Sequence, residues 1–330
     1  MSDPPINKVL QKINFLYRIS GLTVEDRKKT KLEAAKYLFH FIWIGTDIVL
    51  AIDWFIEGAL KGLDFMELTY VMPLFSLGLM GELKAFFHVF YEKNIRLLLR
   101  NIRDLETRKL MDNPFDEEMV RGETKFLSVL MNVLLIMNVI LLLMFNLGPL
   151  VLITVKYFIT GEVELLLPFL DVYPFNAFDL RYWPFAYTHE VWTACIVIIN
   201  IFAVDFLFYI CCTHIRIQFK LLNRELVNLI PKNVNVTCDD IRAKLRDLIG
   251  WHQEVISCAD MLEAIYAKST LFNYLLSSLV ICLTGFNVTA IKNLAIVLTF
   301  AVVAVVGMLQ IFFICFFGDI LFRSSIEVSD

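Results

Sequence analysis

The sequence predicts an all-α polytopic membrane protein, and three observations carry this prediction. The 330 residues are 58% hydrophobic and only 19% charged, whereas soluble domains are about 45–50% apolar and about 25% charged. The mean hydropathy is +0.65. The apolar residues form stretches of about 20 residues or more, the length that a helix needs to cross a hydrocarbon layer roughly 30 Å thick. This composition excludes a disordered protein and a water-soluble enzyme.

Six apolar stretches are the predicted transmembrane helices of a single membrane domain over residues 1–330. They cover residues 37–60, 67–90, 126–147, 187–212, 269–290 and 294–317. Residues 1–36 precede them and lack the apolar core of a cleavable signal peptide. A proline and two glycines interrupt the second stretch, which neighbouring helices can tolerate by satisfying the freed backbone groups. After the third stretch, Gly148-Pro149 is followed by apolar residues 150–159, which either extend that span or lie at the interface.

The distribution of lysine and arginine predicts the orientation. Residues 1–36, 91–125 and 213–268 each contain eight Lys or Arg, and Arg323 follows the sixth span. The connections on the other side contain four, and Lys84 lies within a span. Because basic loops stay in the cytoplasm, both termini are predicted to be cytoplasmic, as an even number of spans requires. The net charge of −4 does not favour a nucleic-acid partner.

Two features of the predicted outer side concern covalent chemistry. Asn287 begins an Asn-x-Thr sequon at the predicted outer face and is the possible glycosylation site, unless the match is due to chance. The second sequon, at Asn235, falls in a predicted cytoplasmic loop. None of the seven cysteines lies in an outer loop, so the sequence predicts no extracellular disulfide framework.

The two longest connections are predicted to be ordered. In the cytoplasmic loop 213–268, apolar residues from Ile241 to Tyr266 recur mostly on one helical face. This predicts a helix that continues into the fifth span and packs its apolar face within the chain or on another subunit. The outer loop 148–186 places aromatic residues next to prolines. This pattern is typical of an aromatic belt at the membrane interface, or of a lid over a lipophilic pocket.

Catalytic and metal-binding signatures are absent from the sequence. It contains no GxxxxGK[ST], GxSxG or HExxH motif, and its five histidines are scattered. No enzyme activity, cofactor or metal site is therefore predicted. The charged residues in the predicted spans are costly in lipid, so they are expected to face other helices or water. They are Asp47, Asp53, Glu57, Glu82, Lys84 and Asp205.

Motifs in the last third of the chain resemble the insect odorant receptor family. They are Leu248-Ile249 with His252, Leu262-Glu263-Ala264-Ile265-Tyr266, Phe272, Leu276-Ser277-Ser278, Ile281-Cys282, Gln310, Cys315, Gly318-Asp319 and Ser324-Ser325. The outer-loop sequences Leu167-Pro168-Phe169 and Tyr173-Pro174-Phe175 are similar to the second extracellular loop of that family, with a moth-like character. The resemblance extends over essentially the whole chain.

The resemblance implies a subunit of a ligand-gated cation channel that forms a heterotetramer with a shared co-receptor. Its expected location is the plasma membrane of olfactory sensory neurons. A volatile hydrophobic odorant or pheromone would bind in the outer half of the helix bundle, and the cytoplasmic helices would supply most subunit contacts. The family has seven spans and the seventh lines the pore, whereas this sequence ends at Asp330, just after Ser324-Ser325. The chain is therefore expected to be truncated and not to conduct ions as it stands.

Candidate ligand contacts lie at helical spacing in the outer halves of spans two, three and four. An apolar lining with few polar groups would suit a volatile ligand. The candidates are Tyr70, Leu74, Leu77, Ile140, Met144, His189, Trp192 and Ile196. Ordinary packing between helices is the alternative explanation for each of them.

Three other classes of membrane protein are alternatives. A gustatory receptor shares the predicted topology. A G-protein-coupled receptor would have an extracellular N-terminus, which the distribution of basic residues opposes. A secondary transporter would show internal repeats or paired broken helices, and the sequence has no such repeat.

Overall fold

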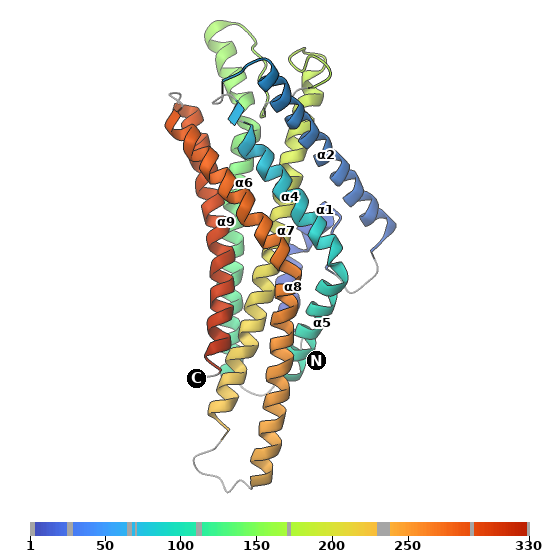
Figure 1. Cartoon of the computed structure of the whole chain (residues 1–330), viewed down its shortest axis with the longest axis vertical. Helices are drawn as coiled ribbons and strands as arrows, with labels where there is room; N and C mark the ends of the chain where they lie inside the picture. The colour runs from blue at the N-terminus through green and yellow to red at the C-terminus, as the bar shows by residue number, and fades with distance from the viewer. Residues whose placement is uncertain are drawn as a thin grey trace.

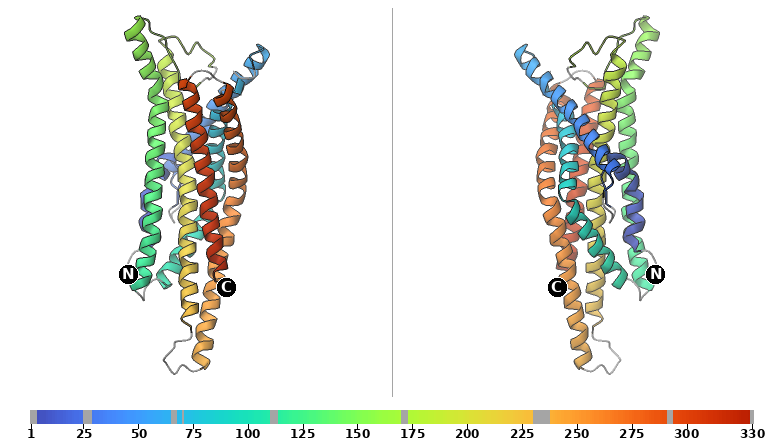
Figure 2. Two further views of the ribbon diagram at one scale, coloured as in Figure 1. Left: turned by 90° about the vertical axis from the view of Figure 1, so that its left-hand side faces the viewer. Right: turned by 90° about the vertical axis from the view of Figure 1, so that its right-hand side faces the viewer.

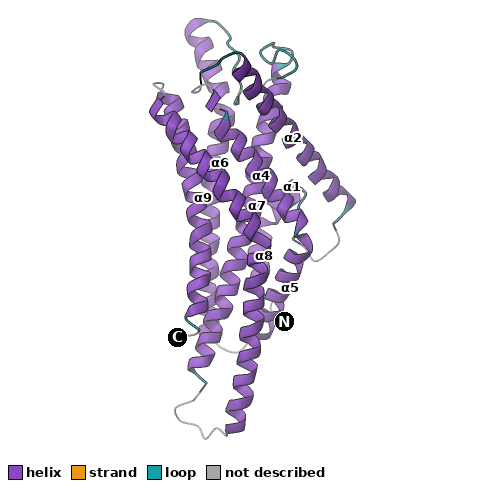
Figure 3. Ribbon diagram, viewed as in Figure 1, coloured by secondary structure: helices purple, strands orange, loops and turns teal. Residues whose placement is uncertain are grey.

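The computed structural model describes residues 4–24, 29–64, 68–69, 71–109, 114–169, 173–229, 238–290 and 294–328. These residues are almost entirely helical and contain no strand (Figure 3). The helices are α1 (Pro5–Ser20), α2 (Lys31–Leu60), α4 (Met72–Phe90), α5 (Glu92–Lys109), α6 (Pro114–Thr160), α7 (Trp183–Val227), α8 (Cys238–Ala290) and α9 (Leu294–Ile326). Among them α2, α6, α7, α8 and α9 are long and apolar enough to cross a membrane. The protein is an all-α polytopic membrane protein, as the sequence predicts.

The long helices form an elongated bundle with α7 at its centre (Figures 1 and 2). Helix α7 contacts α1, α2, α4, α5, α6, α8 and α9. In its most apolar stretch 78% of the residues are buried, against 17–28% in the other four long helices. Those four expose large apolar side chains, among them Phe41, Val129, Leu275 and Phe312. Contiguous apolar surface of this extent marks contact with lipid rather than with water.

All five long helices continue beyond the predicted boundaries of the spans, α2 at its start and α9 at its end. Helix α6 passes through Gly148-Pro149 to Thr160, so residues 150–159 extend the span and the outer loop begins at Gly161 instead of residue 148. A continuous helix satisfies its own backbone groups, which outweighs the tendency of Gly-Pro to end a helix in water. Helix α7 runs past residue 212 to Val227. The predicted cytoplasmic helix and the fifth span form one helix, α8.

The second predicted span, residues 67–90, corresponds to the shorter helix α4. It begins at Met72 and packs between α7 and α8. It is not among the five helices that qualify as spans by length and composition. Its buried charged residues Glu82 and Lys84 lower its hydropathy, and it lies beside α7 and α8 in the bundle (Figure 1).

Helix α1 lies in the N-terminal segment for which the sequence analysis predicted no helix. Its buried residues recur every three or four positions, from Ile6 to Tyr17. The Tyr17 hydroxyl donates to the carbonyl of Ala203 on α7 at 2.9 Å. The helix ends at Gly21 with φ +74, a conformation that favours glycine. A Cβ at Gly21 would also lie 2.6 Å from the backbone nitrogen of Tyr37, so only glycine allows the chain to turn from α1 into α2 here.

The ends of the bundle agree with the predicted orientation. The start of α1, the ends of α7 and α9 and the start of α8 lie in the lower half, and the loop between α6 and α7 lies at the top (Figure 1). Ion pairs join α6 and α7 in the lower half: Glu123 accepts from Arg216 at 2.7 Å and from Lys220 at 2.6 Å, and Asp116 pairs with Arg224. The segments rich in lysine and arginine therefore gather at one end.

Candidate functional site

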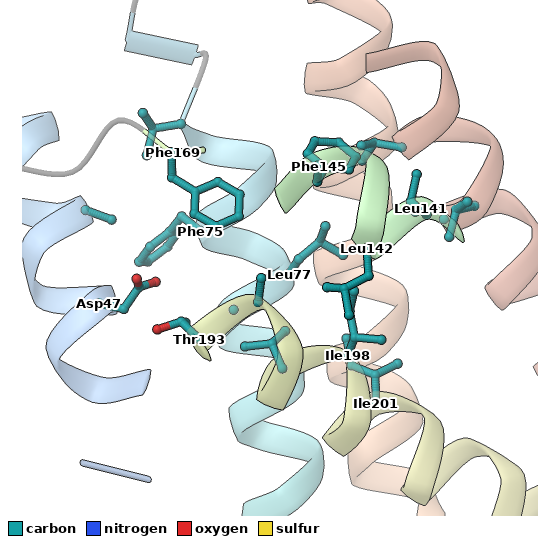
Figure 4. A pocket seen from close by; sticks show the side chains of 18 of the residues that line it. Asp47, Phe75, Leu77, Leu141, Leu142, Phe145, Phe169, Thr193, Ile198 and Ile201 are labelled. Atoms are coloured by element: carbon teal, nitrogen blue, oxygen red, sulfur yellow. The ribbon is translucent and has the colours of Figure 1, made fainter. Parts of the chain in front are cut away.

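A cavity of about 130 Å³ lies in the upper half of the bundle, between α2, α4, α6, α7 and α9 (Figure 4). Its lining is almost entirely apolar, and the aromatic rings of Phe75, Phe145 and Phe169 contribute to it. The other apolar lining residues are Ile48, Ala51, Val71, Leu77, Gly78, Leu141, Leu142, Ala194, Val197, Ile198, Ile201, Val303, Val306 and Gly307. We refer to this space as the upper cavity. Apolar clefts with a few polar groups are the usual form of small-molecule sites.

Polar groups lie at one side of the upper cavity. Asp47 of α2 and Thr193 of α7 face each other there, and Leu142 and Phe145 of α6 lie on the opposite side (Figure 4). The Thr193 hydroxyl donates to the carbonyl of His189 at 3.0 Å, and the Asp47 carboxylate lies 3.8 Å from His189 Nδ1. The hydroxyl oxygen of Thr193 can still accept a hydrogen bond from a ligand. The cavity is therefore polar at one side and apolar at the other.

The outer loop covers the upper cavity. Phe169 lines it, and its backbone N–H donates to Glu190 Oε2 at 2.8 Å. The Tyr173 hydroxyl reaches the other oxygen of Glu190 at 3.4 Å, and the Trp183 indole donates to the carbonyl of Leu166 at 2.9 Å. Glu190 is fully buried. These contacts hold the loop against α7 and favour the interpretation of this loop as a lid.

A buried polar network forms the floor of the upper cavity. Gln310 of α9 lines the cavity, and its amide nitrogen donates to Asp205 of α7 at 2.9 Å and to Asn273 of α8 at 3.4 Å. The other carboxylate oxygen of Asp205 pairs with Lys84 of α4. Both charged side chains are nearly inaccessible. The network therefore connects the cavity to four helices and gives Lys84 the partner on another helix that the sequence analysis expects.

The structure places the predicted contacts of spans two and three in different environments. Leu77 lines the upper cavity. Tyr70 lies outside the described residues, as does the side chain of Leu74. Ile140 and Met144 are 53% and 65% exposed on the outer surface of α6. The residues of α6 that line the cavity are Leu141, Leu142 and Phe145.

The predicted contacts on α7 are also turned away from the upper cavity. The His189 ring packs 5.1 Å from that of Trp43. Trp192 is partly exposed, and Ile196 is buried in a cluster with Ile44 on α2. The side chains of α7 that line the cavity are Thr193, Ala194, Val197, Ile198 and Ile201. Lipid-facing and cavity-facing positions are both apolar, so apolar spacing alone does not separate them.

Apart from Leu77, the lining residues were absent from the predicted contacts. Among them are Asp47, Phe169 and Gln310, which are not apolar residues of a predicted span. A polar residue inside an apolar span is the signal that could have identified Asp47 and Gln310. Phe169 belongs to the outer loop, whose position depends on tertiary contacts.

Asn287 does not have the geometry of a glycosylation site. Its side chain is fully buried. Its amide nitrogen donates to the carbonyl of Thr69 at 3.2 Å, and its amide oxygen accepts from the Thr69 hydroxyl at 3.0 Å. Both functional atoms of the amide are therefore engaged inside the protein. Among the residues that the structure describes, no group of three or more His, Cys, Asp or Glu is placed to hold a metal ion.

Comparison with known sequences finds a match to the family described as 7tm Odorant receptor, over residues 64–330. Putative odorant receptor 92a of Drosophila melanogaster is 23% identical over 296 residues, which are 87% of this chain and 70% of the relative. Odorant receptor 67c of the same species is 23% identical over 268 residues, which are 79% of this chain and 64% of the relative.

Comparison with solved structures finds the same fold. The insect olfactory receptor OR5 from Machilis hrabei aligns with a TM-score of 0.75 and 14% identity, over 98% of this chain and 80% of that one. The structure of OR5 in complex with eugenol aligns with a TM-score of 0.77 and 15% identity, over 94% of this chain and 79% of that one. At this identity the likeness concerns the fold alone.

Proposed function

The chain belongs to the 7tm odorant receptor family, and from this premise we propose that it is a receptor subunit that binds a small volatile molecule in the upper cavity. With a co-receptor, it gates a cation channel in the plasma membrane of olfactory sensory neurons. The relatives named above are odorant receptors, which gives no support to the gustatory receptor, G-protein-coupled receptor and transporter alternatives.

The observation that carries this proposal is the apolar upper cavity beneath the outer loop. Its volume of about 130 Å³ is close to that of the engineered cavity of about 150 Å³ that binds benzene. A ligand with one aromatic ring therefore fits the space as it stands. A larger ligand has to displace a movable lining side chain such as Phe75 or Phe169.

The polar groups of the upper cavity favour a ligand that donates a hydrogen bond. Asp47 offers a carboxylate, and Thr193 offers the lone pairs of its hydroxyl oxygen. The amide nitrogen of Gln310 donates to Asp205, so its amide oxygen is the atom that remains to accept from a ligand. Three acceptors and an apolar opposite wall suit an aromatic or aliphatic alcohol. Eugenol, the ligand in the OR5 complex, is a phenol of this kind.

Filling the upper cavity tests its role. A Cβ at Gly78 would meet nothing within 4 Å, so Gly78→Leu projects a side chain into the cavity without striking the backbone. Gly285→Leu is the matched control, because Gly285 is also unobstructed and lies on the exposed surface of α8. We expect eugenol, phenol or benzyl alcohol to raise the Tm of the purified wild type and of Gly285→Leu, and not that of Gly78→Leu. At 100 times Kd the stabilisation is about 2.7 kcal/mol.

Two outcomes contradict this site. One is that none of the three alcohols stabilises the wild type. The other is that Gly78→Leu responds to them as the wild type does.

Replacing Thr193 tests the choice of ligand chemistry. Thr193→Val keeps the shape of the side chain and removes the oxygen that would accept from the ligand. A neutral hydrogen bond contributes about 0.5–1.5 kcal/mol, so we expect the affinity for phenol to fall by about three- to tenfold. Toluene has no hydroxyl and is the matched ligand, and its affinity should not fall. Isothermal titration of the purified variant measures both, and equal losses for the two ligands would assign Thr193 to packing alone.

The cytoplasmic half of α8 supports pairing with a second subunit. One of its faces packs within the chain through buried residues that include Trp251 and Val255. Another face exposes Leu245, Ile249 and Ile256, which lie below the predicted fifth span and therefore in water. Apolar residues so placed favour contact with another protein. We therefore propose that one face of this helix packs within the chain and the other contacts a second subunit.

Co-purification tests this interface. We expect the triple variant Leu245→Ala, Ile249→Ala and Ile256→Ala to reduce the recovery of a tagged insect olfactory co-receptor with this chain. The matched control exchanges Leu271, Leu275 and Leu279 for alanine, because these exposed residues lie on the same helix within the predicted span. Undiminished recovery with the first variant would remove this face from the assembly.

A further inference from the structure

A second cavity, of about 610 Å³, lies at the lower end of the molecule between α1, α5 and the start of α6. We call it the basic groove. It is larger than the upper cavity, and on α6 its lining residues end at Ser128, whereas those of the upper cavity begin at Leu141. Its volume lies within the range of about 300–1,000 Å³ that is usual for ligand sites.

Four cationic side chains line the basic groove. Lys8 and Lys12 lie one turn apart on α1, and Arg121 and Lys125 lie one turn apart on α6. Within the part of the chain that the structure describes, none of the four belongs to an ion pair, whereas Arg216 and Lys220 on the neighbouring α7 both pair with Glu123.

The acidic residues of the basic groove do not balance this charge. The buried carboxylate of Glu106 accepts from the backbone N–H of Ile6 at 3.1 Å and contacts His214 Nδ1 at 2.5 Å. It is therefore committed to holding α1, α5 and α7 together. Glu117 is the other acidic lining residue, and it is exposed. With Glu106 engaged in these contacts, Glu117 stands against four cations, so the lining of the groove carries an excess of positive charge.

The basic groove lies at the predicted boundary between water and lipid. On α1, the exposed residues Phe15 and Ile19 continue the stripe of Lys8 and Lys12 towards the membrane. On α6, the exposed Val129 and Val133 continue the stripe of Arg121 and Lys125 in the same way. The exposed side chains of α1 and α6 thus change from basic to apolar at the same depth along the bundle.

Two further observations locate the basic groove relative to the predicted spans. Arg121 and Lys125 directly precede the third predicted span, which begins at residue 126. Tyr17, five residues beyond Lys12 on α1, bonds to Ala203, which lies inside the fourth predicted span. Phospholipid headgroups occupy this layer, and juxtamembrane basic residues on the cytoplasmic side attract anionic ones.

We propose that the basic groove binds a multiply charged phosphate group, and that its source is the headgroup of an anionic phospholipid in the cytoplasmic leaflet. Arginine and lysine are the side chains that form charge-assisted hydrogen bonds with phosphate oxygens. The hydroxyls of Thr107 and Thr124 line the same space and can donate to further oxygens. A bound headgroup joins α1 to α6 through their four cations, and so stabilises the docking of α1 on the bundle. This site is independent of the ligand proposed for the upper cavity.

The test measures lipid binding to the purified full chain in a neutral detergent, by native mass spectrometry and by thermal shift. The probes are dioctanoyl phosphatidylinositol bisphosphate, its free headgroup inositol trisphosphate, inorganic pyrophosphate and the neutral dioctanoyl phosphatidylcholine. The test variant combines Lys8→Gln, Lys12→Gln, Arg121→Gln and Lys125→Gln. The matched control removes four exposed cations outside the groove: Lys93→Gln, Arg242→Gln, Lys244→Gln and Arg246→Gln.

We expect the wild type and the control variant to bind phosphatidylinositol bisphosphate in preference to phosphatidylcholine, and the groove variant to bind it at least about tenfold more weakly. Weaker binding of inositol trisphosphate and pyrophosphate identifies the membrane as the source of the phosphate, and equal binding identifies a soluble one. Equal losses in the groove and control variants would overturn the proposal, since they show non-specific attraction. Lack of binding of all three phosphate probes to the wild type would overturn it as well.

Discussion

Lys84 illustrates at the scale of single residues how the protein keeps charge inside a membrane. A lysine in the middle of a span is costly unless a partner neutralises it. Asp205 on another helix is that partner, and Gln310 and Asn273 complete the network around it. Since Gln310 also lines the upper cavity, the residues that stabilise the bundle and those that shape the proposed ligand site are in direct contact.

Removing one member of the Lys84–Asp205 pair should destabilise the protein strongly. Lys84→Met leaves an unpaired buried carboxylate, and such changes cost about 3–5 kcal/mol. We expect a lower Tm in detergent for Lys84→Met and for Asp205→Leu, and recovery of much of the loss in the double variant. Lys61→Met serves as the control, since Lys61 and its partner Glu57 form an exposed pair that contributes little. Additive losses in the double variant would show that the two side chains are not coupled.

Single residues also explain why, among the predicted ligand contacts whose side chains the structure describes, Leu77 alone lines the upper cavity. On α6, Ile140 and Met144 face outwards, while the adjacent Leu141 and Phe145 face the cavity. The sequence gives an apolar side chain at all four positions. Lipid and an apolar cavity select for the same side chains, so the rotation of the helix about its axis is not encoded in the hydropathy pattern.

At the scale of helices, the close approach of α4 and α7 depends on Gly81. A Cβ at this position would lie 3.0 Å from both Cγ1 and the backbone oxygen of Val197. Membrane helices have no hydrophobic force drawing them together, and small residues allow the close packing that holds them. Gly81 therefore sets the distance between two of the helices that enclose the upper cavity.

Adding one methyl group to α4 should lower the Tm at Gly81 and not at Gly78. Gly81→Ala forces Val197 to move, and overpacking of this kind costs about 1–3 kcal/mol. Gly78 lies one turn earlier, and its Cβ would meet nothing within 4 Å, so Gly78→Ala should not lower the Tm. Thermal unfolding of the two purified variants in detergent measures the difference. Equal Tm values would show that the α4–α7 contact adjusts freely.

Helices α8 and α1 show which helices the pattern of apolar residues predicts and which it misses. Helix α8 combines the predicted cytoplasmic helix with the fifth span. Its buried face continues from Leu248 to Asn287 and includes polar residues such as Ser269 within the span. Helix α1 was not predicted, although Ile6, Ile13 and Tyr17 follow a helical period. It is short and amphipathic, and its docking on α7 is what buries its apolar face.

At the scale of the whole molecule, charge and hydropathy divide the bundle into three zones. Apolar side chains surround the middle of α2, α6, α8 and α9, basic segments gather at the lower end, and the outer loop covers the top. Figure 2 shows from two further sides that the loop between α6 and α7 lies at the end of the bundle opposite the end of α7 and the start of α8. Such a division positions a membrane protein in the bilayer without any specific lipid contact.

The orientation can be tested on cells. An epitope tag fused to Met1 should be reached by antibodies only after permeabilisation, because residues 1–36 carry eight basic residues. A tag inserted between Gly161 and Glu162, two exposed residues of the outer loop, is the positive control and should be reached on intact cells. Labelling of the N-terminal tag on intact cells would reverse the predicted topology.

The sequence by itself determined the all-α membrane fold, the order of the apolar helices and the predicted side of each terminus. These properties follow from the hydropathy and charge of each segment, which partition between lipid and water however the helices pack. The family resemblance rested likewise on residues in sequence order, and the match over residues 64–330 confirms it.

Only the tertiary structure decided which faces meet. It showed Asp205 as the partner of Lys84, brought Asp47, Phe169 and Gln310 around the upper cavity, and placed the cations of α1 beside those of α6. Each of these depends on the rotation and depth of one helix relative to another. In a membrane those are set by packing, because every face of an apolar helix is equally compatible with lipid.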